Sequence, residues 1–135
     1  MRLPYSFFCP VNNTIQRNRE SKVQAVIKLI EERVPGVKFV RVKEDSEAVI
    51  RIAFDHKHPD GSTWSRVGRD AEEIDSDKPT MNLSDVTGHD SGEIQVGSDE
   101  YIDIVHEFFH SLGMRHEHQH PERKFTISKT GTFTF

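Results

Sequence analysis

The segment from Ile104 to Arg123, IVHEFFHSLGMRHEHQHPER, contains five of the eight histidines of this 135-residue chain. His106 and His110 are four residues apart, so on an α-helix their side chains leave the same face about one turn apart. Two imidazoles placed in this way can bind one Zn²⁺ at about 2.0–2.1 Å. The segment therefore predicts a helix that carries two metal ligands. After the end of this helix, a turn of the chain can bring a third ligand close to them.

The flanking residues predict where this helix begins and ends. Ser98 is the predicted N-cap, and Asp99 and Glu100 follow it in the first turn, where acidic groups interact favourably with the helix dipole. An apolar face at helical spacing continues the pattern, with Tyr101, Ile104, Val105, Phe108 and Leu112. Gly113 is predicted to end the helix. The turn at Gly113 lets His116 approach as the third ligand.

Glu107 follows the first predicted ligand and can reach a metal-bound water without binding the metal itself. Three neutral histidines leave the fourth zinc position open to that water. Glu107 can accept its proton and later pass the proton to the leaving amine. The pattern predicts a zinc site of His106, His110 and His116 with Glu107 as general base. The alternative is a solvated, histidine-rich helix end, which the capped amphipathic helix disfavours.

The rest of the chain predicts a mixed α and β domain. An amphipathic helix is predicted from residue 13 or 14 to Val34, and Pro35 stops it. Val37 to Val42 alternates as a strand does, and Ala48 to Phe54 is the best candidate for a central strand. The sequences STWSRVGRD and PTMNLS are predicted to be two further short strands. The N-terminal MRLPYSFFCPV, interrupted by two prolines, is interpreted as an ordinary N-terminal segment, or as a domain start exposed by truncation, rather than as a signal peptide.

Composition limits the classes of function. The length fits one domain, residues 1–135. A net charge of −4 lacks the basic footprint of nucleic-acid binding. No apolar run is long enough to predict a membrane span. Cys9 is the only cysteine, so a zinc site must use histidine and carboxylate ligands. Oligomeric state is not indicated.

The motif HEFFHSLGMRHE resembles the zinc-binding pattern of the metzincin peptidases, and Glu117 after the third histidine resembles the astacin branch. GSTWSRVGRD, PTMNLS and HEHQHPER are similar to segments of microbial and fungal astacin-like zinc peptidases. The resemblance implies an α+β fold: a zincin-like N-terminal subdomain with a twisted, mostly parallel sheet, an antiparallel edge strand and two long helices, the second carrying the zinc motif. That subdomain would extend to about residue 123, and residues 124–135 would form an atypical tail.

The resemblance also implies a substrate and a place for it. An extended polypeptide would pair with the antiparallel edge strand by strand addition. The residues of that predicted strand are Trp64, Ser65, Arg66, Val67, Gly68 and Arg69. The alternative for Trp64 and Val67 is packing in the core. Secretion is typical of the resembled family, but no clear signal peptide is present.

The sequence also departs from the family pattern. Metzincins have a methionine turn after the third histidine, and in astacins a tyrosine follows it, whereas every methionine and tyrosine of this chain precedes His116. The tail is interpreted either as a short hairpin that covers apolar surface or as a truncated end. The leading hypothesis is a zinc metalloendopeptidase. The alternatives are a catalytically weak or inactive zinc-binding remnant that binds peptides, and a small metallohydrolase with another substrate.

Further polar residues have weaker interpretations. His118 and His120 are predicted to be exposed rather than ligands of a second metal, and His56 and His58 to lie in a surface loop. Asp103, one turn before Glu107, is either a partner of the site or part of a solvated helix face.

Overall fold

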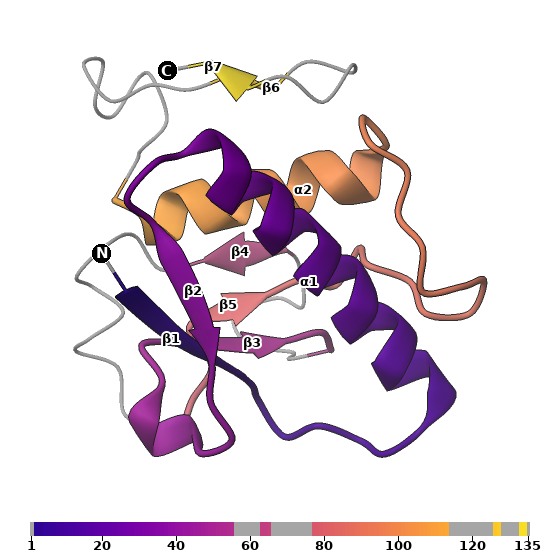
Figure 1. Ribbon diagram of the computed structural model, residues 1–135. Helices are drawn as coiled ribbons and strands as arrows, with labels where there is room; N and C mark the ends of the chain where they lie inside the picture. Colours follow the sequence, from indigo (N-terminus) through magenta and orange to yellow (C-terminus); the bar gives the residue numbers. More distant parts are fainter. Residues whose placement is uncertain (1, 56–62, 66–76, 114–125, 128–132, 135) are drawn as a thin grey trace.

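Five strands form a mixed sheet with the order β2-β1-β3-β5-β4 in the computed structural model (Figure 1). The structure describes residues 2–55, 63–65, 77–113, 126–127 and 133–134. The strands are β1 (Arg2–Phe7), β2 (Lys38–Arg41), β3 (Ile50–Ala53), β4 (Trp64–Ser65) and β5 (Met81–Asn82). β1 pairs in parallel with β2 and β3, β3 pairs in parallel with β5, and β4 is antiparallel to β5 at the end of the sheet. These findings confirm the mixed α and β class and the predicted central strand.

The sequence did not predict the strand that the N-terminal segment forms. This segment forms β1, which lies between β2 and β3 and buries Tyr5, Ser6 and Phe7. Pro4 pairs only with β2, because the pairing of β1 with β3 begins at Tyr5. The carbonyl of Pro4 still accepts a hydrogen bond from the Val49 amide at 2.9 Å. The proline therefore removes one donor near the start of the strand, where the sheet tolerates it.

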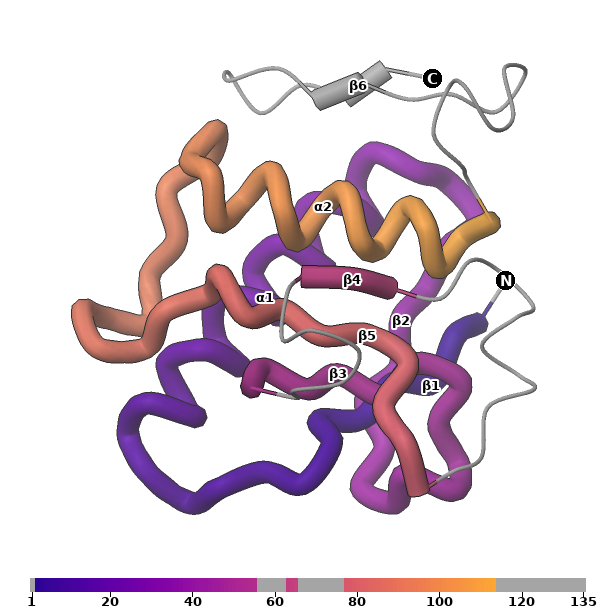
Figure 2. The backbone as a smooth tube through the Cα atoms, turned by 180° about the vertical axis from the view of Figure 1, so that it is seen from behind, coloured from indigo at the N-terminus to yellow at the C-terminus, as the bar shows by residue number. Residues whose placement is uncertain are grey.

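Two helices bury their apolar faces against the sheet (Figures 1 and 2). α1 (Thr14–Arg33) begins at the N-cap Asn13, whose side chain accepts a hydrogen bond from the Gln16 amide. α2 (Asp99–Ser111) begins at the predicted N-cap Ser98, which accepts from the Tyr101 amide. Both predicted helices are confirmed, with bounds within two residues of those expected. Neither has both the length and the apolar composition to cross a membrane, among the residues that the structure describes.

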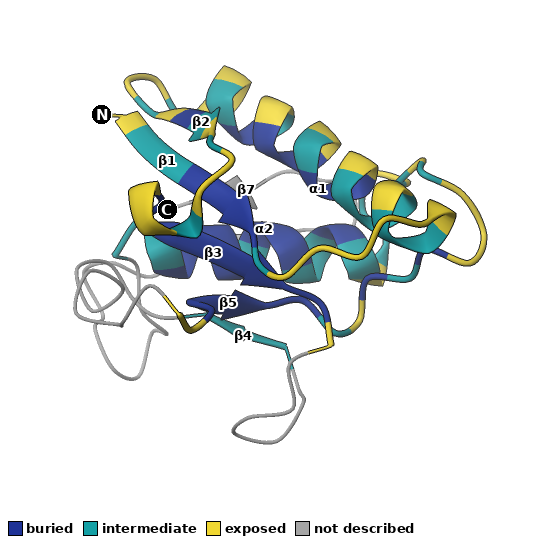
Figure 3. Cartoon of the chain, turned by 90° about the horizontal axis from the view of Figure 1, so that it is seen from below, coloured by how far each residue is buried: buried dark blue, intermediate teal, exposed yellow. Residues whose placement is uncertain are grey.

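The core lies where the two helices meet the sheet. Phe39 of β2 packs edge-on against Phe108 of α2, with ring centroids 5.2 Å apart. The exposed residues of α1 lie on its outer side, while β3 and β5 are buried (Figure 3). The fully buried apolar residues of the helices are Val23, Val26, Ile30, Tyr101, Ile104, Val105, Phe108 and Phe109. This packing fixes α2, the helix of the predicted zinc motif, in the centre of the molecule.

Two smaller elements complete the described structure. A short 3₁₀ helix, η1 (Asp45–Glu47), connects β2 to β3. In the tail, β6 (Thr126–Ile127) and β7 (Phe133–Thr134) pair antiparallel, and β6 lies near α2. The described part of the tail thus has the geometry of the hairpin interpretation.

Candidate metal centre and substrate strand

α2 presents the central residues of the motif together. His106 is half-buried, while Glu107 and His110 are 6% and 7% exposed. The imidazole rings of His106 and His110 lie with centroids 4.5 Å apart and planes tilted by 59°. Gly113 has φ of 92°, the left-handed conformation that favours glycine, and its amide bonds to the His110 carbonyl. The predicted end of the helix is therefore confirmed.

The carboxylate of Glu107 lies beside the His110 imidazole. Its Oε1 atom is 3.4 Å from Nδ1 of His110. This oxygen is buried and accepts no hydrogen bond from the described residues. A buried carboxylate oxygen without a donor is unfavourable for folding alone, so such a group is a candidate for a functional role.

The donor set fits a zinc ion. Two imidazoles one helical turn apart are preferred zinc ligands, and a carboxylate beside them can bind or deprotonate a water. No complete group of three potential ligands occurs among the residues placed by the structure. The predicted third ligand, His116, lies outside those residues, as do Glu117, His118 and His120. The three-histidine site stays a prediction.

The predicted substrate strand is described in part. β4 contains Trp64 and Ser65, both half-buried, and lies alongside α2 (Figure 2). Trp64 pairs with Asn82 and Ser65 with Met81. The antiparallel edge position is thus as predicted for these two residues. The remaining predicted residues, Arg66 to Arg69, lie outside the described residues, as do His56 and His58.

Asp103 lies one turn before Glu107 on the same helix. It is half-buried, and its carboxyl is hydrogen-bonded to that of Asp85. Burial, followed by the hydrogen bond to Asp85 and the charges of Asp85, Glu107 and Asp99, raises the pKa of Asp103 to about 6. The solvated-face interpretation of Asp103 was therefore wrong, because a folded neighbour covers and bonds this side chain.

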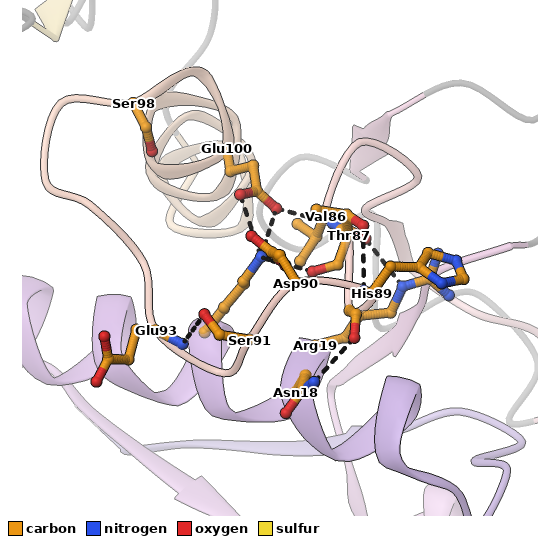
Figure 4. Close-up of polar contacts among 12 residues, drawn as sticks. Asn18, Arg19, Val86, Thr87, His89, Asp90, Ser91, Glu93, Ser98 and Glu100 are labelled. Atoms are coloured by element: carbon orange, nitrogen blue, oxygen red, sulfur yellow. Dashed lines mark hydrogen bonds and ion pairs between the residues drawn. The ribbon is translucent and has the colours of Figure 1, made fainter.

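A buried cation at the other end of α2 was not predicted. The side chain of Lys22 is fully buried, and its Nζ donates to the Thr87 carbonyl at 2.6 Å, to Asp90 Oδ1 at 3.0 Å and to Glu100 Oε2 at 3.1 Å. Glu100 Oε2 also accepts from the Thr87 amide at 2.8 Å. Figure 4 shows Glu100, Asp90 and Thr87 converging from α2 and the preceding loop. These contacts fix the start of the motif helix on α1.

Neighbouring residues of α1 hold the same loop. Asn18 Nδ2 donates to the Gly88 carbonyl at 2.8 Å, and Arg19 Nε donates to the Val86 carbonyl at 2.9 Å (Figure 4). A Cβ atom at Gly88 would come within 2.2 Å of the Ile15 carbonyl oxygen, so only glycine fits there. The one sequence signal for this contact was the position of Lys22 on the apolar face of α1, which does not identify its partners.

Comparison with known proteins supports the prediction of a zinc motif. No protein-family model matches the chain. Zinc metalloproteinase nas-24 of Caenorhabditis elegans is 29% identical over 98 residues, which cover 67% of this chain and 25% of that protein. The chain thus spans about a quarter of the length of this relative. Sequence similarity therefore connects the chain to a zinc metalloproteinase.

Solved structures share the fold. A structure of myroilysin superposes with a TM-score of 0.60 at 23% identity, covering 96% of this chain and 55% of that chain. A crystal structure of myroilysin gives a TM-score of 0.55 at 21% identity, covering 84% and 43%. The two matches establish that the α+β architecture occurs in a known protein. Each covers about half of the longer chain.

Proposed function

We propose that this chain is a zinc-dependent metalloendopeptidase of the astacin-like metzincin type that hydrolyses peptide bonds in extended polypeptides. The observation that carries the proposal is the buried Glu107 carboxylate 3.4 Å from the His110 imidazole, on a helix that lies beside the edge strand β4. The similarity to a zinc metalloproteinase supports it.

His106 and His110 would hold the zinc ion together with His116. When bound, zinc would polarise the scissile carbonyl and lower the pKa of a water molecule. Glu107 would accept a proton from the attacking water and then donate it to the departing amine, so the carboxylate is regenerated.

The substrate would be recognised through its backbone. An extended peptide added antiparallel to β4 would continue the sheet, since β4 is its terminal strand in the described order. Trp64, Ser65 and the predicted residues Arg66 to Arg69 would form this surface. Because β4 lies alongside α2, a peptide paired with β4 would pass close to Glu107.

The direct test is peptide cleavage by the zinc-loaded protein beside Glu107→Ala. Loss of the general base is expected to lower the rate by about 100-fold or more. Zinc content should be unchanged, because Glu107 is not a proposed ligand. Glu93→Ala, which removes an exposed glutamate in the loop before α2, is the matched control. A Glu107→Ala protein as active as the parent would contradict the mechanism.

A second candidate is a zinc-binding chain that binds peptides without cleaving them. The observation that favours it is that none of residues 117–135 is a methionine or a tyrosine, the two residue types that the resemblance places after the third histidine. Loss of one oxyanion donor alone costs about 100- to 1,000-fold in rate. Zinc and peptide binding by the parent without cleavage would select this candidate.

A further inference from the structure

Two serine hydroxyls connect the proposed substrate strand to the catalytic helix. Ser65 Oγ of β4 lies 3.0 Å from Ser111 Oγ at the last position of α2, and the two residues are 46 positions apart in the sequence. Ser111 Oγ also donates to the backbone carbonyl of Glu107, at a longer 3.4 Å. Both serines are half-buried. The contact thus extends from the strand to the backbone of the proposed base.

The direction of these hydrogen bonds follows from the number of protons. A serine hydroxyl donates one hydrogen bond and can accept others. The proton of Ser111 is used towards the Glu107 carbonyl, a bond that serines in helices commonly make to the residue four positions earlier. With the proton of Ser111 directed to that carbonyl, Ser65 is the donor to Ser111, although either hydroxyl can donate across the 3.0 Å contact. In either direction the contacts lead from Ser65 through Ser111 to the Glu107 backbone.

The residue preceding β4 also makes polar contacts that lead to α2. Thr63 Oγ1 donates to Asp85 Oδ2 at 3.0 Å and lies 3.2 Å from Ser84 Oγ. The carboxyl of Asp85 is in turn hydrogen-bonded to that of Asp103 on α2. Side-chain contacts therefore lie on both sides of Trp64. Ser65 contacts α2 directly, whereas Thr63 is connected to α2 only through Asp85.

We propose that the Ser65–Ser111 pair is a positioning contact that sets the distance of the substrate strand β4 from the backbone of Glu107. This inference rests on the proposed function, since it assigns β4 the role of pairing with substrate. A peptide paired with β4 inherits the position of the strand. A shift of the strand would move the scissile bond relative to Glu107, and small displacements of reacting groups lower rates strongly.

The kinetic test compares Ser65→Ala, Ser111→Ala and the double variant on two substrates. One is an extended peptide that pairs with β4, and the other is a peptide too short to reach β4. Each single variant is expected to lower kcat/KM for the extended peptide about tenfold, mainly through KM, and for the short peptide less than twofold. The double variant should lose no more than either single variant, because both remove the same contact.

Two further variants separate positioning from general damage. Ser111→Thr keeps a hydroxyl that can bond to the carbonyl four residues earlier, so it should restore most of the activity. Ser91→Ala removes an exposed hydroxyl that bonds only within its own loop, to the Glu93 amide, and should have no effect. Additive losses in the double variant, or equal losses on both peptides, would overturn the inference.

Trp64 provides a readout that does not depend on catalysis. It is the only tryptophan of the chain and precedes Ser65 directly. If Ser111 holds β4, Ser111→Ala should increase acrylamide quenching of the Trp64 fluorescence, with Ser91→Ala unchanged. If the parent cleaves no peptide, the proposed function fails, but the quenching experiment still tests the Ser65–Ser111 contact. Unchanged quenching of Trp64 in Ser111→Ala would overturn the role of this contact.

Discussion

Two carboxylates on the same helix have opposite surroundings. Glu100, in the first turn of α2, accepts hydrogen bonds from the buried Lys22 ammonium and from the Thr87 amide. Glu107, two turns later, has a buried Oε1 atom that accepts no hydrogen bond from the described residues and lies 3.4 Å from Nδ1 of His110. The same type of side chain therefore stabilises the fold at one end of α2, whereas in the proposed function it carries out chemistry at the other.

The difference follows from what each region must do. Lys22 has three donor protons and three acceptor groups around it, so its charge is compensated within the protein. A group that must exchange protons with water and substrate cannot have all its bonds filled in this way. Attachment of the start of α2 to α1 and the preceding loop then holds the later turns of the same helix in place.

Lys22→Met is expected to give the largest loss of stability, because it leaves two carboxylates without their cation. Removing one partner of a buried ion pair costs about 3–5 kcal/mol. Asp90 is 61% exposed and Glu100 24% exposed, so the expected decrease in unfolding free energy is about 2–3 kcal/mol. Urea unfolding with a chelator present measures it. Lys28→Met, at an exposed position of the same helix, should change little, and equal losses in the two would refute the role of the cluster.

Glu100→Gln and Glu107→Gln make the same chemical change at the two ends of α2. Glu100→Gln should lower the unfolding free energy by about 1–2 kcal/mol, since Lys22 loses its less exposed anionic partner. Glu107→Gln should not lower it, because the change removes a buried charge whose Oε1 accepts no hydrogen bond from the described residues, while it should abolish cleavage. Unfolding and peptide assays on both variants check this. Equal stability losses would remove the distinction between the two regions.

Asp103→Asn tests the hydrogen bond between Asp103, which lies between Glu100 and Glu107 on α2, and Asp85. The folded-state pKa of Asp103, about 6, is above its ordinary value of 3.8, so the folded protein binds more protons than the unfolded chain between these values. Unfolding free energy should therefore fall as pH rises from about 4 to 6 and then level off.

The asparagine variant should lose this part of the pH dependence. An amide can donate to Asp85 at any pH, so the variant should be more stable than the parent at pH 7, by on the order of 1 kcal/mol after allowing for solvent screening, and similar at pH 4. Unfolding curves of zinc-free protein at the two pH values measure this. Asp77→Asn, at an exposed position, is the control. A parallel pH profile in Asp103→Asn and the parent would contradict the assignment.

Local sequence signals predicted the helices well. The N-cap Ser98, the apolar spacing and Gly113 defined α2, because capping and helical periodicity act within a few residues. The same periodicity placed His106, Glu107 and His110 on one helix. It did not identify β1, because Pro4 masked a strand whose central position depends on pairing with distant strands.

The sequence by itself determined the elements that short-range rules control: the limits of the two helices, the central strand β3 and the spacing of the motif side chains. Tertiary structure alone decided which distant groups meet. Lys22 and Glu100 are 78 positions apart, and Ser65 and Ser111 are 46 apart. No local pattern pairs such residues, because their contact depends on how the helices and the sheet pack together.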